Sequence, residues 1–473
     1  MAALSLDQVL KDVQGAARGP VGFVEFTAVS TDSRSVPPGA LFIALKGPNF
    51  DGHQFVEQAR KRGARGAVVS DLSGQKVSPR FPLIVVADTH RALLDLAQGH
   101  RSRHAATVIG ITGSNGKTTT KDLTGSVLAA HAPTVTSAKS FNNRIGLPLT
   151  LLGLDQETRY AVVEMGSSGK GEIAELASTA RPQVGVLTNV THAHLQGLGT
   201  LDGVMEEKAD LLRALPKSGL AVLNADDPRF EPLRERTTAR VVSFALQRRA
   251  TYTATDVRWD MQRLAFRLNG KDRVLVRLAG CHNVANTLAA LAVALELGAP
   301  MKDAVRALRS FAGRPGRLCP LTIGQLLLID DTYNANPGSM GAAIKTFSLV
   351  RHPGRRVLVL GDMRELGADA ERLHREVGAH LSIGGFDLVI GVGPLTAFLL
   401  EAVTQRGFNV PLVRHFATTE EALRAVPGLL LADDAVLVKG SRALGLERVV
   451  ETVRDWALRA TQRTPNVPEM AVP

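Results

Sequence analysis

The chain has 473 residues, of which 45% are hydrophobic and 21% are charged, proportions typical of a soluble globular protein. This length exceeds what one hydrophobic core can serve and predicts about three domains of ~150 residues each. No apolar run approaches the ~18 residues that cross a bilayer, and the N-terminus lacks the features of an export signal. The two cysteines, Cys281 and Cys319, have neither metal-binding nor disulfide-framework spacing, so we expect a cytoplasmic protein.

The net charge is +11, because 56 Lys and Arg residues exceed 45 Asp and Glu residues. A basic surface attracts phosphate groups, which makes a nucleic-acid partner one interpretation. Aromatic residues amount to 4%, too few for stacking platforms on single strands, and the basic residues are scattered. We therefore expect no nucleic-acid partner, since a small and highly anionic substrate explains the same excess of charge.

The first section, residues 1–103, mixes short strand-like runs with helical stretches. Strands are expected at 41–45 and 83–86, and helices at 54–62 and 91–98. The mixture predicts a small α/β domain.

The second section, residues 104–313, alternates strands with helices. Such alternation requires crossover connections and predicts a parallel sheet. Residues 251–279 differ, because they alternate like antiparallel strands around the turn Asn269-Gly270, and helical sequence resumes at Asn283. The strands expected in the parallel sheet are 108–112, 160–164, 184–189 and 220–224.

The third section, residues 314–473, predicts a second open α/β sheet. The chain as a whole is thus an α/β protein of three domains. Residues 461–473 are polar and contain prolines, which predicts a disordered tail. The strands expected in this section are 326–330, 357–360, 388–392 and 435–439.

A glycine-rich segment lies between a β-branched strand and a helix and predicts ATP binding. Its glycines let backbone amides surround phosphate oxygens, Lys117 reaches the outer phosphates, and the Thr118 hydroxyl can ligate Mg²⁺. The strict phosphate-loop pattern has a further glycine where this chain has Ile111. A strand-to-helix turn without a ligand is the alternative, and the Lys-Thr-Thr run argues against it. The expected loop residues are Gly113, Ser114, Asn115, Gly116, Lys117, Thr118 and Thr119.

Two further side chains at strand ends are candidate Mg²⁺ ligands. Glu164 ends a strand that a parallel sheet would place beside the phosphate loop, although a surface acid at a strand end is the alternative. His194 follows the next strand and could ligate a second Mg²⁺ or be structural. Spacing leaves both interpretations of His194 open.

Several segments together resemble the Mur ligases of bacterial cell-wall synthesis. They are ITGSNGKTT (111–119), EMG (164–166), NVTHAHLQGLG (189–199) followed by Lys208, and GCHNVANTLAA (280–290). The resemblance covers nearly the whole chain, and this family also lacks the first glycine of the phosphate-loop pattern. It implies a three-domain ligase with an N-terminal UDP-binding domain, a central ATP-binding domain and a Rossmann-like C-terminal domain.

The outer segments resemble one member of this family in particular, the ligase that joins D-alanyl-D-alanine to UDP-N-acetylmuramoyl-tripeptide. This implies an acyl-phosphate intermediate and conversion of ATP to ADP and phosphate. The alternatives are a nucleotide-switched binding protein, a folylpolyglutamate synthase-like enzyme, and the preceding ligase, whose Asn-Pro-Arg motif is missing here. The segments are STDSRSVPPGALFIALKG (30–47), DGH (51–53), SFNNRIGLP (140–148), DDTYNANPGS (330–339) and GDMRELG (361–367).

The resemblance also implies roles for individual residues. Lys117, Glu164, His194 and Lys208 would be catalytic, with Thr118, Glu164 and His194 holding two Mg²⁺ and Lys208 carbamylated. ATP would further contact His282, Asn283, Asn286, Arg317, Asp330 and Asn334. The UDP substrate would contact Ser33, Arg34, Asp51, Gly52, His53, Asn142 and Asn143.

The chain departs from the family pattern at two positions. Gln196 replaces an acid after His194, and Arg144 stands where an acid is common after Asn142 and Asn143. We expect the first to alter the surroundings of His194 and the second to alter tripeptide contacts. A monomer is expected.

Overall fold

The structure is a computed structural model that describes residues 3–19, 22–73, 78, 80–405 and 411–463. The chain forms two compact units. The first comprises Met1–Thr188, Met205–Thr251 and Ala289–Ala307, and the second comprises Asn189–Val204, Tyr252–Leu288 and Leu308–Pro473.

The first unit begins with a small five-stranded sheet in the order β2-β7-β6-β5-β4, which is parallel except for β2. Helix α1 (Leu6–Val13) precedes it and starts with a capping box, in which Ser5 and Gln8 satisfy each other's backbone amides. The other elements are β2 (Ala16–Arg18), β4 (Ala28–Ser30), β5 (Ala40–Ile43), η1 (Gly52–Phe55), α2 (Val56–Lys61), β6 (Gly66–Val69), β7 (Leu83–Val85) and α3 (Thr89–Ser102).

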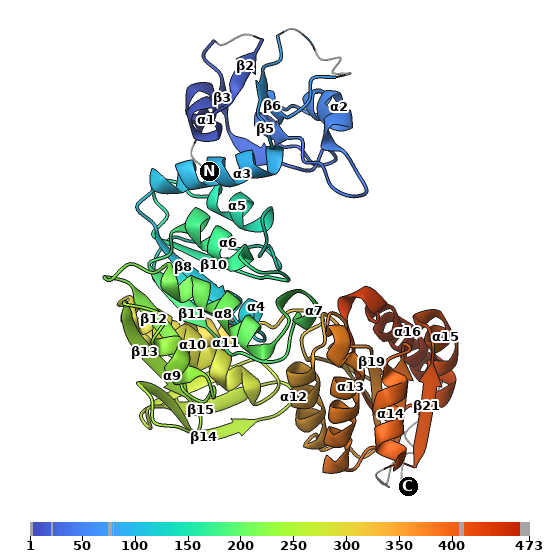
Figure 1. The fold of residues 1–473 in the computed structure, drawn as a ribbon. Helices are drawn as coiled ribbons and strands as arrows, with labels where there is room; N and C mark the ends of the chain where they lie inside the picture. Colours follow the sequence, from blue (N-terminus) through green and yellow to red (C-terminus); the bar gives the residue numbers. More distant parts are fainter. Residues whose placement is uncertain (1–2, 20–21, 74–77, 79, 406–410, 464–473) are drawn as a thin grey trace, which may run out of the picture. The chain divides into compact units, whose positions relative to one another are not determined.

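Helix α3 joins this sheet to the next part of the unit. Figure 1 shows α3 between the small sheet and helix α5. Its buried residues Leu93 and Leu96 belong to one hydrophobic core with Leu147 and Leu151 of α5. Hydrophobic packing is therefore continuous across residue 103, where the first section of the sequence was expected to end.

The phosphate-loop part of the first unit contains six parallel strands in the order β13-β12-β11-β8-β10-β9. Strands β8, β10 and β11 are buried almost throughout, as their apolar sequences predict for a sheet covered on both faces. The parallel sheet is confirmed, with two strands, β9 and β13, beyond those expected. Its elements are β8 (Thr107–Thr112), α4 (Lys117–Ala129), β9 (Thr134–Thr136), α5 (Gly146–Leu151), β10 (Tyr160–Glu164), α6 (Glu172–Ala180), β11 (Val184–Leu187), α8 (Leu201–Arg213), β12 (Leu220–Asn224) and β13 (Arg240–Ala245).

The second unit contains the expected antiparallel strands. Strand β15 (Leu264–Leu268) pairs with both β14 (Tyr252–Trp259) and β16 (Asp272–Val276). Asn269 and Gly270 connect β15 to β16, and both have positive φ (48° and 73°), as a tight hairpin turn requires. The turn predicted from the sequence is confirmed. Helices α10 (His282–Glu296) and α11 (Met301–Ser310) follow along the chain, and their residues within Ala289–Ala307 belong to the first unit.

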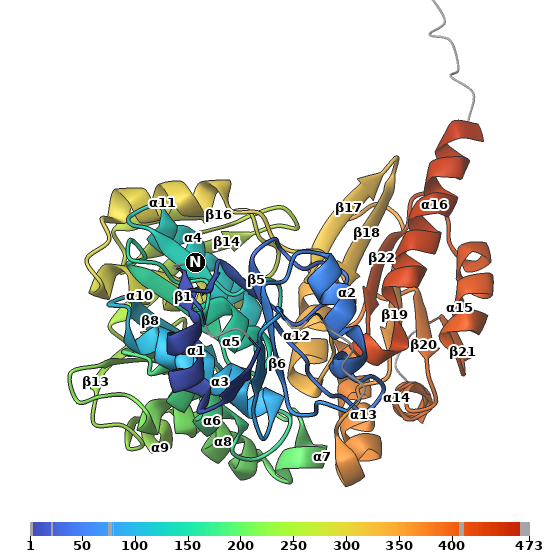
Figure 2. The same cartoon turned by 90° about the horizontal axis from the view of Figure 1, so that it is seen from above.

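The second sheet has the order β17-β18-β22-β19-β20-β21 and is parallel apart from β17. Helices α12, α13 and α14 pack together, as do α15 and α16, and Figure 2 shows the two groups on either side of the sheet. The predicted open α/β sheet is confirmed. Its elements are β17 (Cys319–Ile323), β18 (Leu326–Asp331), α12 (Pro337–Ser348), β19 (Arg356–Gly361), α13 (Ala370–Ala379), β20 (Leu388–Val392), α14 (Thr396–Gln405), β21 (Leu412–Phe416), α15 (Thr419–Ala425), β22 (Ala435–Lys439) and α16 (Glu447–Arg463).

Helix α16 continues further than the sequence suggested. It ends at Arg463, so residues 461–463 of the expected disordered tail are helical, and 464–473 lie outside the described residues. Within the described part of the chain, no helix is both long and apolar enough to cross a membrane.

Candidate active site

The phosphate loop lies at the carboxyl end of β8, where Gly113 and Gly116 have φ values of 138° and 80°. Residues other than glycine rarely adopt these φ values, so the conformation of the loop requires glycine at both positions. Lys117 begins α4, and its Nζ donates to the carbonyls of Gly113 (2.7 Å) and Ser114 (3.0 Å). Thr188, just past β11, donates to the Asn115 carbonyl at 2.6 Å. The loop is thus held in shape by its own lysine and by the neighbouring strand.

Glu164 ends β10, directly beside β8, and is 1% exposed. Its Oε1 accepts a hydrogen bond from Asn142 Nδ2 at 2.8 Å. Its Oε2 is buried and has no hydrogen-bond partner among the described residues. A buried carboxylate oxygen is costly unless a donor or cation compensates it, so Glu164 fits a bound cation.

No cluster of three or more His, Cys, Asp or Glu side chains suited to a metal occurs in the part of the chain that the structure describes. Mg²⁺ does not need such a cluster, because it keeps several waters and binds through one or two carboxylates together with substrate phosphates. Thr118, at the start of α4, is buried and supplies a hydroxyl of the kind that ligates Mg²⁺ in phosphate loops.

Lys208 lies on α8 and is fully buried. Its Nζ donates to Ser167 Oγ at 2.6 Å. Burial, and secondarily the positive charge of Lys117, lowers the pKa of Lys208 to about 7. A large fraction of this amine is therefore uncharged near neutral pH, and an uncharged amine is nucleophilic.

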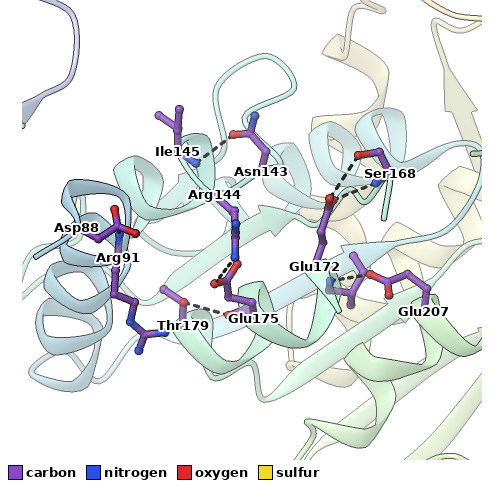
Figure 3. A network of polar contacts seen from close by, with 11 residues as sticks. Asp88, Arg91, Asn143, Arg144, Ile145, Ser168, Glu172, Glu175, Thr179 and Glu207 are labelled. Carbon is purple, nitrogen blue, oxygen red and sulfur yellow. Dashed lines mark hydrogen bonds and ion pairs between the residues drawn. The ribbon is translucent and has the colours of Figure 1, made fainter. Parts of the chain in front are cut away.

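Glu207, the residue before Lys208, caps the N-terminus of α6. Glu207 accepts hydrogen bonds from the amides of Gly171 (2.7 Å) and Ile173 (2.8 Å), as Figure 3 shows for part of this network. A carboxylate at a helix N-terminus satisfies unpaired amides and interacts favourably with the helix dipole. Sequence reasoning missed both Glu207 and Ser167, because neither signals its partner in the local pattern.

In the second unit, His194 has a left-handed backbone (φ 55°) and precedes helix α7 (Leu195–Leu198). Its Nδ1 bonds Glu365 Oε2, and the Gln196 amide donates to the Glu365 carbonyl at 3.0 Å. The bond from His194 lowers the pKa of Glu365. His194 Nε2 has no partner within the described residues, so the ring presents this nitrogen for another ligand. The GDMRELG motif contained Glu365, but its partner could not be read from the sequence.

Three of the expected ATP contacts, His282, Asn283 and Asn286, lie in the first turns of α10. Asn283 Nδ2 donates to the Ala279 carbonyl at 2.7 Å, and Asn286 Nδ2 donates to Asn283 Oδ1 at 2.8 Å. Asn283 is the second residue of α10. His282 is exposed, whereas both asparagines are buried.

The two acids at the end of β18, Asp330 and Asp331, both support local structure. Asp330 accepts from the Gly316 amide (2.9 Å) and from Thr332, whereas Asp331 pairs with Lys439 Nζ at 2.7 Å. Lys439 also donates to the carbonyl of Asn334 at 2.9 Å.

Arg317, in the same part of the second unit, stacks its guanidinium 4.1 Å from the ring centre of Tyr333. A planar guanidinium held against an aromatic ring is oriented in advance of any anion that it binds.

In the small N-terminal sheet, the Asp51-Gly52-His53 segment forms its own turn. Asp51 Oδ1 accepts from the His53 amide (3.0 Å) and contacts His53 Nδ1 (2.6 Å), and His53 Nε2 accepts from the Ser70 amide (2.9 Å). A side chain at Gly52 would meet the Leu45 carbonyl at 2.7 Å. The backbone packing therefore requires glycine there.

Ser33 and Arg34 follow β4. Ser33 Oγ donates to Gln58 Oε1 at 3.1 Å. Arg34 forms a two-pronged ion pair with Asp32, and the hydrogen bonds from Arg34 lower the pKa of Asp32 to about 2. The Arg34 side chain is 82% exposed, so its guanidinium is accessible to a substrate phosphate.

Taken together, the parallel sheet, the loop at the end of β8 and the adjacent Glu164 define an α/β nucleotide-binding protein of the phosphate-loop class. Three family models match the chain. The Mur ligase family catalytic domain matches residues 25–101, the Mur ligase middle domain matches 111–294, and the Mur ligase glutamate ligase domain matches 316–442. The chain belongs to the Mur ligase family.

Individual relatives match over nearly their whole length. The UDP-N-acetylmuramoyl-tripeptide--D-alanyl-D-alanine ligase of Escherichia coli K12 is 38% identical, over 96% of this chain and 99% of its own. The ligase of the same name from Mycobacterium tuberculosis H37Rv is 35% identical, over 96% and 98%.

Solved structures of similar proteins agree with the fold. A crystal structure of MurF from Acinetobacter baumannii has a TM-score of 0.87 at 33% identity and covers 96% of this chain and 99% of that one. The crystal structure of MurF ligase from Thermotoga maritima in complex with ADP has a TM-score of 0.79 at 27% identity, with coverage of 92% and 98%.

Proposed function

We propose that this chain is an ATP-dependent ligase that joins D-alanyl-D-alanine to UDP-N-acetylmuramoyl-tripeptide during peptidoglycan precursor synthesis. The observation that carries the proposal is the phosphate loop beside Glu164, in a chain that matches ligases of this name over 96% of its length. The ADP complex of the Thermotoga maritima relative supports the use of ATP.

Amide formation from a carboxylate at neutral pH requires activation, because the carboxylate oxygen is a poor leaving group. The terminal carboxylate of the tripeptide attacks the γ-phosphorus of ATP, the bond to the β–γ bridging oxygen breaks, and ADP leaves. The amine of D-alanyl-D-alanine then attacks the acyl carbon of the resulting acyl phosphate. Phosphate leaves, and the nitrogen loses a proton. Lys117 stabilises the charge on the transferring phosphoryl group.

Thr118, Glu164 and His194 would hold Mg²⁺, at two sites, and the metal when bound would neutralise charge on the phosphate oxygens. Oε2 of Glu164 and Nε2 of His194, which have no hydrogen-bond partner in the described part of the chain, support these assignments.

We further propose that Lys208 is carbamylated. Its uncharged amine attacks the carbon of CO₂ and loses a proton, which leaves a carboxylate on the side chain. Burial and the lowered pKa support this step, because an amine must be uncharged to react. The new carboxylate would support the metal.

The remaining contacts follow the family pattern. ATP contacts the loop residues Gly113 to Thr119, together with His282, Asn283, Asn286, Arg317, Asp330 and Asn334. The UDP-linked substrate contacts Ser33, Arg34, Asp51, Gly52, His53, Asn142 and Asn143.

We propose domains at residues 1–103, 104–313 and 314–473, and the three family matches each fall inside one of these ranges. We also propose that the enzyme acts as a monomer in the cytoplasm. Its isolated preparation should sediment as a single chain at the concentrations used for assay.

A phosphate-release assay tests the function. Wild-type protein with ATP, Mg²⁺ and UDP-N-acetylmuramoyl-tripeptide should release phosphate in a manner that depends on added D-alanyl-D-alanine. Omission of the tripeptide is the control for background ATP hydrolysis. Turnover that is indifferent to the dipeptide, or that requires a free amino acid in its place, would refute the assignment.

A further inference from the structure

The segment between β9 and α5 is a loop held at several points. Lys121 of α4 is fully buried and donates to the carbonyls of Ser137 (2.7 Å) and Lys139 (2.8 Å) at its start. Asn143 Oδ1 accepts from the amides of residues 145 and 146 at its end. Between them Asn142 bonds Glu164 at 2.8 Å. A loop held in this way presents its exposed side chains in a defined position.

Arg144 projects from this loop. Its side chain is 61% exposed, and it pairs with Glu175 of α6 through Nε and through Nη2, the latter at 2.7 Å. Nη1 has no hydrogen-bond partner within the described residues. A guanidinium has five N–H donors in a planar fork, so Arg144 can hold Glu175 and a second carboxylate together.

Arg144 occupies an intermediate place along a row of polar side chains. Figure 3 shows Arg91 of α3 and Asp88, the N-cap residue of that helix, on one side of Arg144. On the other side it shows Ser168, Glu172 and Glu207. The row therefore runs from the helix that borders the small N-terminal sheet toward the segment that contains Lys208. A substrate bound at the small sheet by its UDP end, and at Glu164 by its reacting end, must cross this region.

The substrate that such a ligase uses is rich in carboxylates. One Acinetobacter baumannii relative is named UDP-N-acetylmuramoylalanyl-D-glutamyl-2,6-diaminopimelate--D-alanyl-D-alanyl ligase. In a linear peptide of that composition, the glutamyl residue keeps one free carboxylate, and diaminopimelate keeps another besides the one that reacts. A peptide that ends in lysine has the glutamyl carboxylate but lacks the second.

We propose that Arg144 binds a free carboxylate of the tripeptide, one that does not react, through the unoccupied edge of its guanidinium. The proposal rests on the proposed function and adds a specificity-determining residue to it. Glu175 holds the edge of the guanidinium formed by Nε and Nη2, and this leaves the edge with Nη1 for the substrate. The alternative is that Arg144 only anchors α6 through its ion pair with Glu175. In that case, loss of Arg144 and loss of Glu175 would change KM for the tripeptide to the same extent.

The experiment measures kcat and KM for the tripeptide in Arg144→Ala, Arg144→Lys and Glu175→Gln, each with lysine- and diaminopimelate-ending substrates. Arg306→Ala is the matched control, because Arg306 is also exposed and pairs with Asp303. We expect Arg144→Ala to raise KM about tenfold, Arg144→Lys to restore part of the loss, and kcat to change little. Glu175→Gln should not raise KM.

The two substrates identify the carboxylate. A rise in KM for the diaminopimelate substrate alone assigns it to the third residue, and an equal rise for both assigns it to the glutamyl residue. Unchanged KM in Arg144→Ala, or the same loss in Glu175→Gln as in Arg144→Ala, would overturn the proposal. Turnover by the wild-type protein is measured in the same series, so failure of the proposed function would be seen separately.

Discussion

Lys208 shows at the scale of one residue how surroundings change a side chain. On a helix surface it would be a charged lysine, but here it is fully buried against Ser167 with its pKa lowered to about 7. Desolvation disfavours the ammonium form, and the charge of Lys117 adds to that effect. An uncharged amine is what the proposed reaction with CO₂ requires.

Removal of the Lys208 amine should slow catalytic turnover. We expect Lys208→Ala to lower kcat by about 10- to 100-fold, the range found for groups that support a metal site. Added bicarbonate should not restore the activity, because no amine remains to react. Phosphate release measures the effect, and Lys217→Ala, at an exposed lysine, is the control. Full activity of Lys208→Ala would eliminate the carbamate.

The lowered pKa also makes stability depend on pH. Between pH 7 and the ordinary pKa of 10.5, the unfolded chain binds more protons at Lys208 than the folded chain, so stability increases with pH across this window. Relative to Lys208→Met, the wild-type protein should gain about 2 kcal/mol between pH ~7 and ~9. Urea unfolding in CO₂-depleted buffer measures this difference. A constant difference between the two proteins would show that Lys208 titrates normally.

At the scale of elements, the short helix α7 depends on a contact from a distant part of the sequence. His194 precedes α7 and bonds Glu365, which lies in the loop after β19. A carboxylate on Nδ1 fixes the tautomer and the orientation of an imidazole, which is what the Mg²⁺-binding role proposed for His194 would require.

Loss of this carboxylate should weaken the response to Mg²⁺. We expect Glu365→Gln to raise the Mg²⁺ concentration for half-maximal activity by about tenfold or more, with a smaller effect on kcat at saturating Mg²⁺. Glu376→Gln is a matched control, because Glu376 has a similar exposure (55% against 53%) and pairs with Arg372. An equal response of the two variants to Mg²⁺ would contradict the role assigned to Glu365.

At the scale of the whole molecule, one hydrophobic core joins the small N-terminal part of the first unit to its phosphate-loop part. Leu93 and Leu96 of α3 are fully buried within the cluster that also contains Leu147 and Ile173. Burial of a leucine side chain contributes about 1.5–3 kcal/mol, so α3 depends on both sides of the boundary near residue 103.

A fragment of residues 1–103 should therefore be incompletely folded. We expect the amides of α3 to exchange hydrogen faster in the fragment than in the full chain, and the fragment to bind a hydrophobic dye. Hydrogen exchange followed by mass spectrometry gives the comparison, with the strands β5 and β6 as an internal reference. Equal protection of α3 in both proteins would mean that the N-terminal section folds independently.

Much of the fold could be predicted because the relevant signals are local. Buried parallel strands such as β10, β12, β20 and β22 appear as short apolar runs, and each has the expected position. Strands β17 and β21 were not expected, because they lie at sheet edges and are partly exposed. Their residues therefore lack a continuous apolar pattern.

By itself, the sequence determined the phosphate loop from Gly113 to Thr119, the hairpin at Asn269-Gly270 and the alternation of strands and helices. Each depends on the conformational preferences of adjacent residues, which the chain carries locally. Tertiary structure alone decided that Lys208 is buried, that Oε2 of Glu164 has no hydrogen-bond partner among the residues the structure describes, and that Glu365 contacts His194. These properties arise from desolvation and from contacts between segments far apart in the chain, and no local pattern records them.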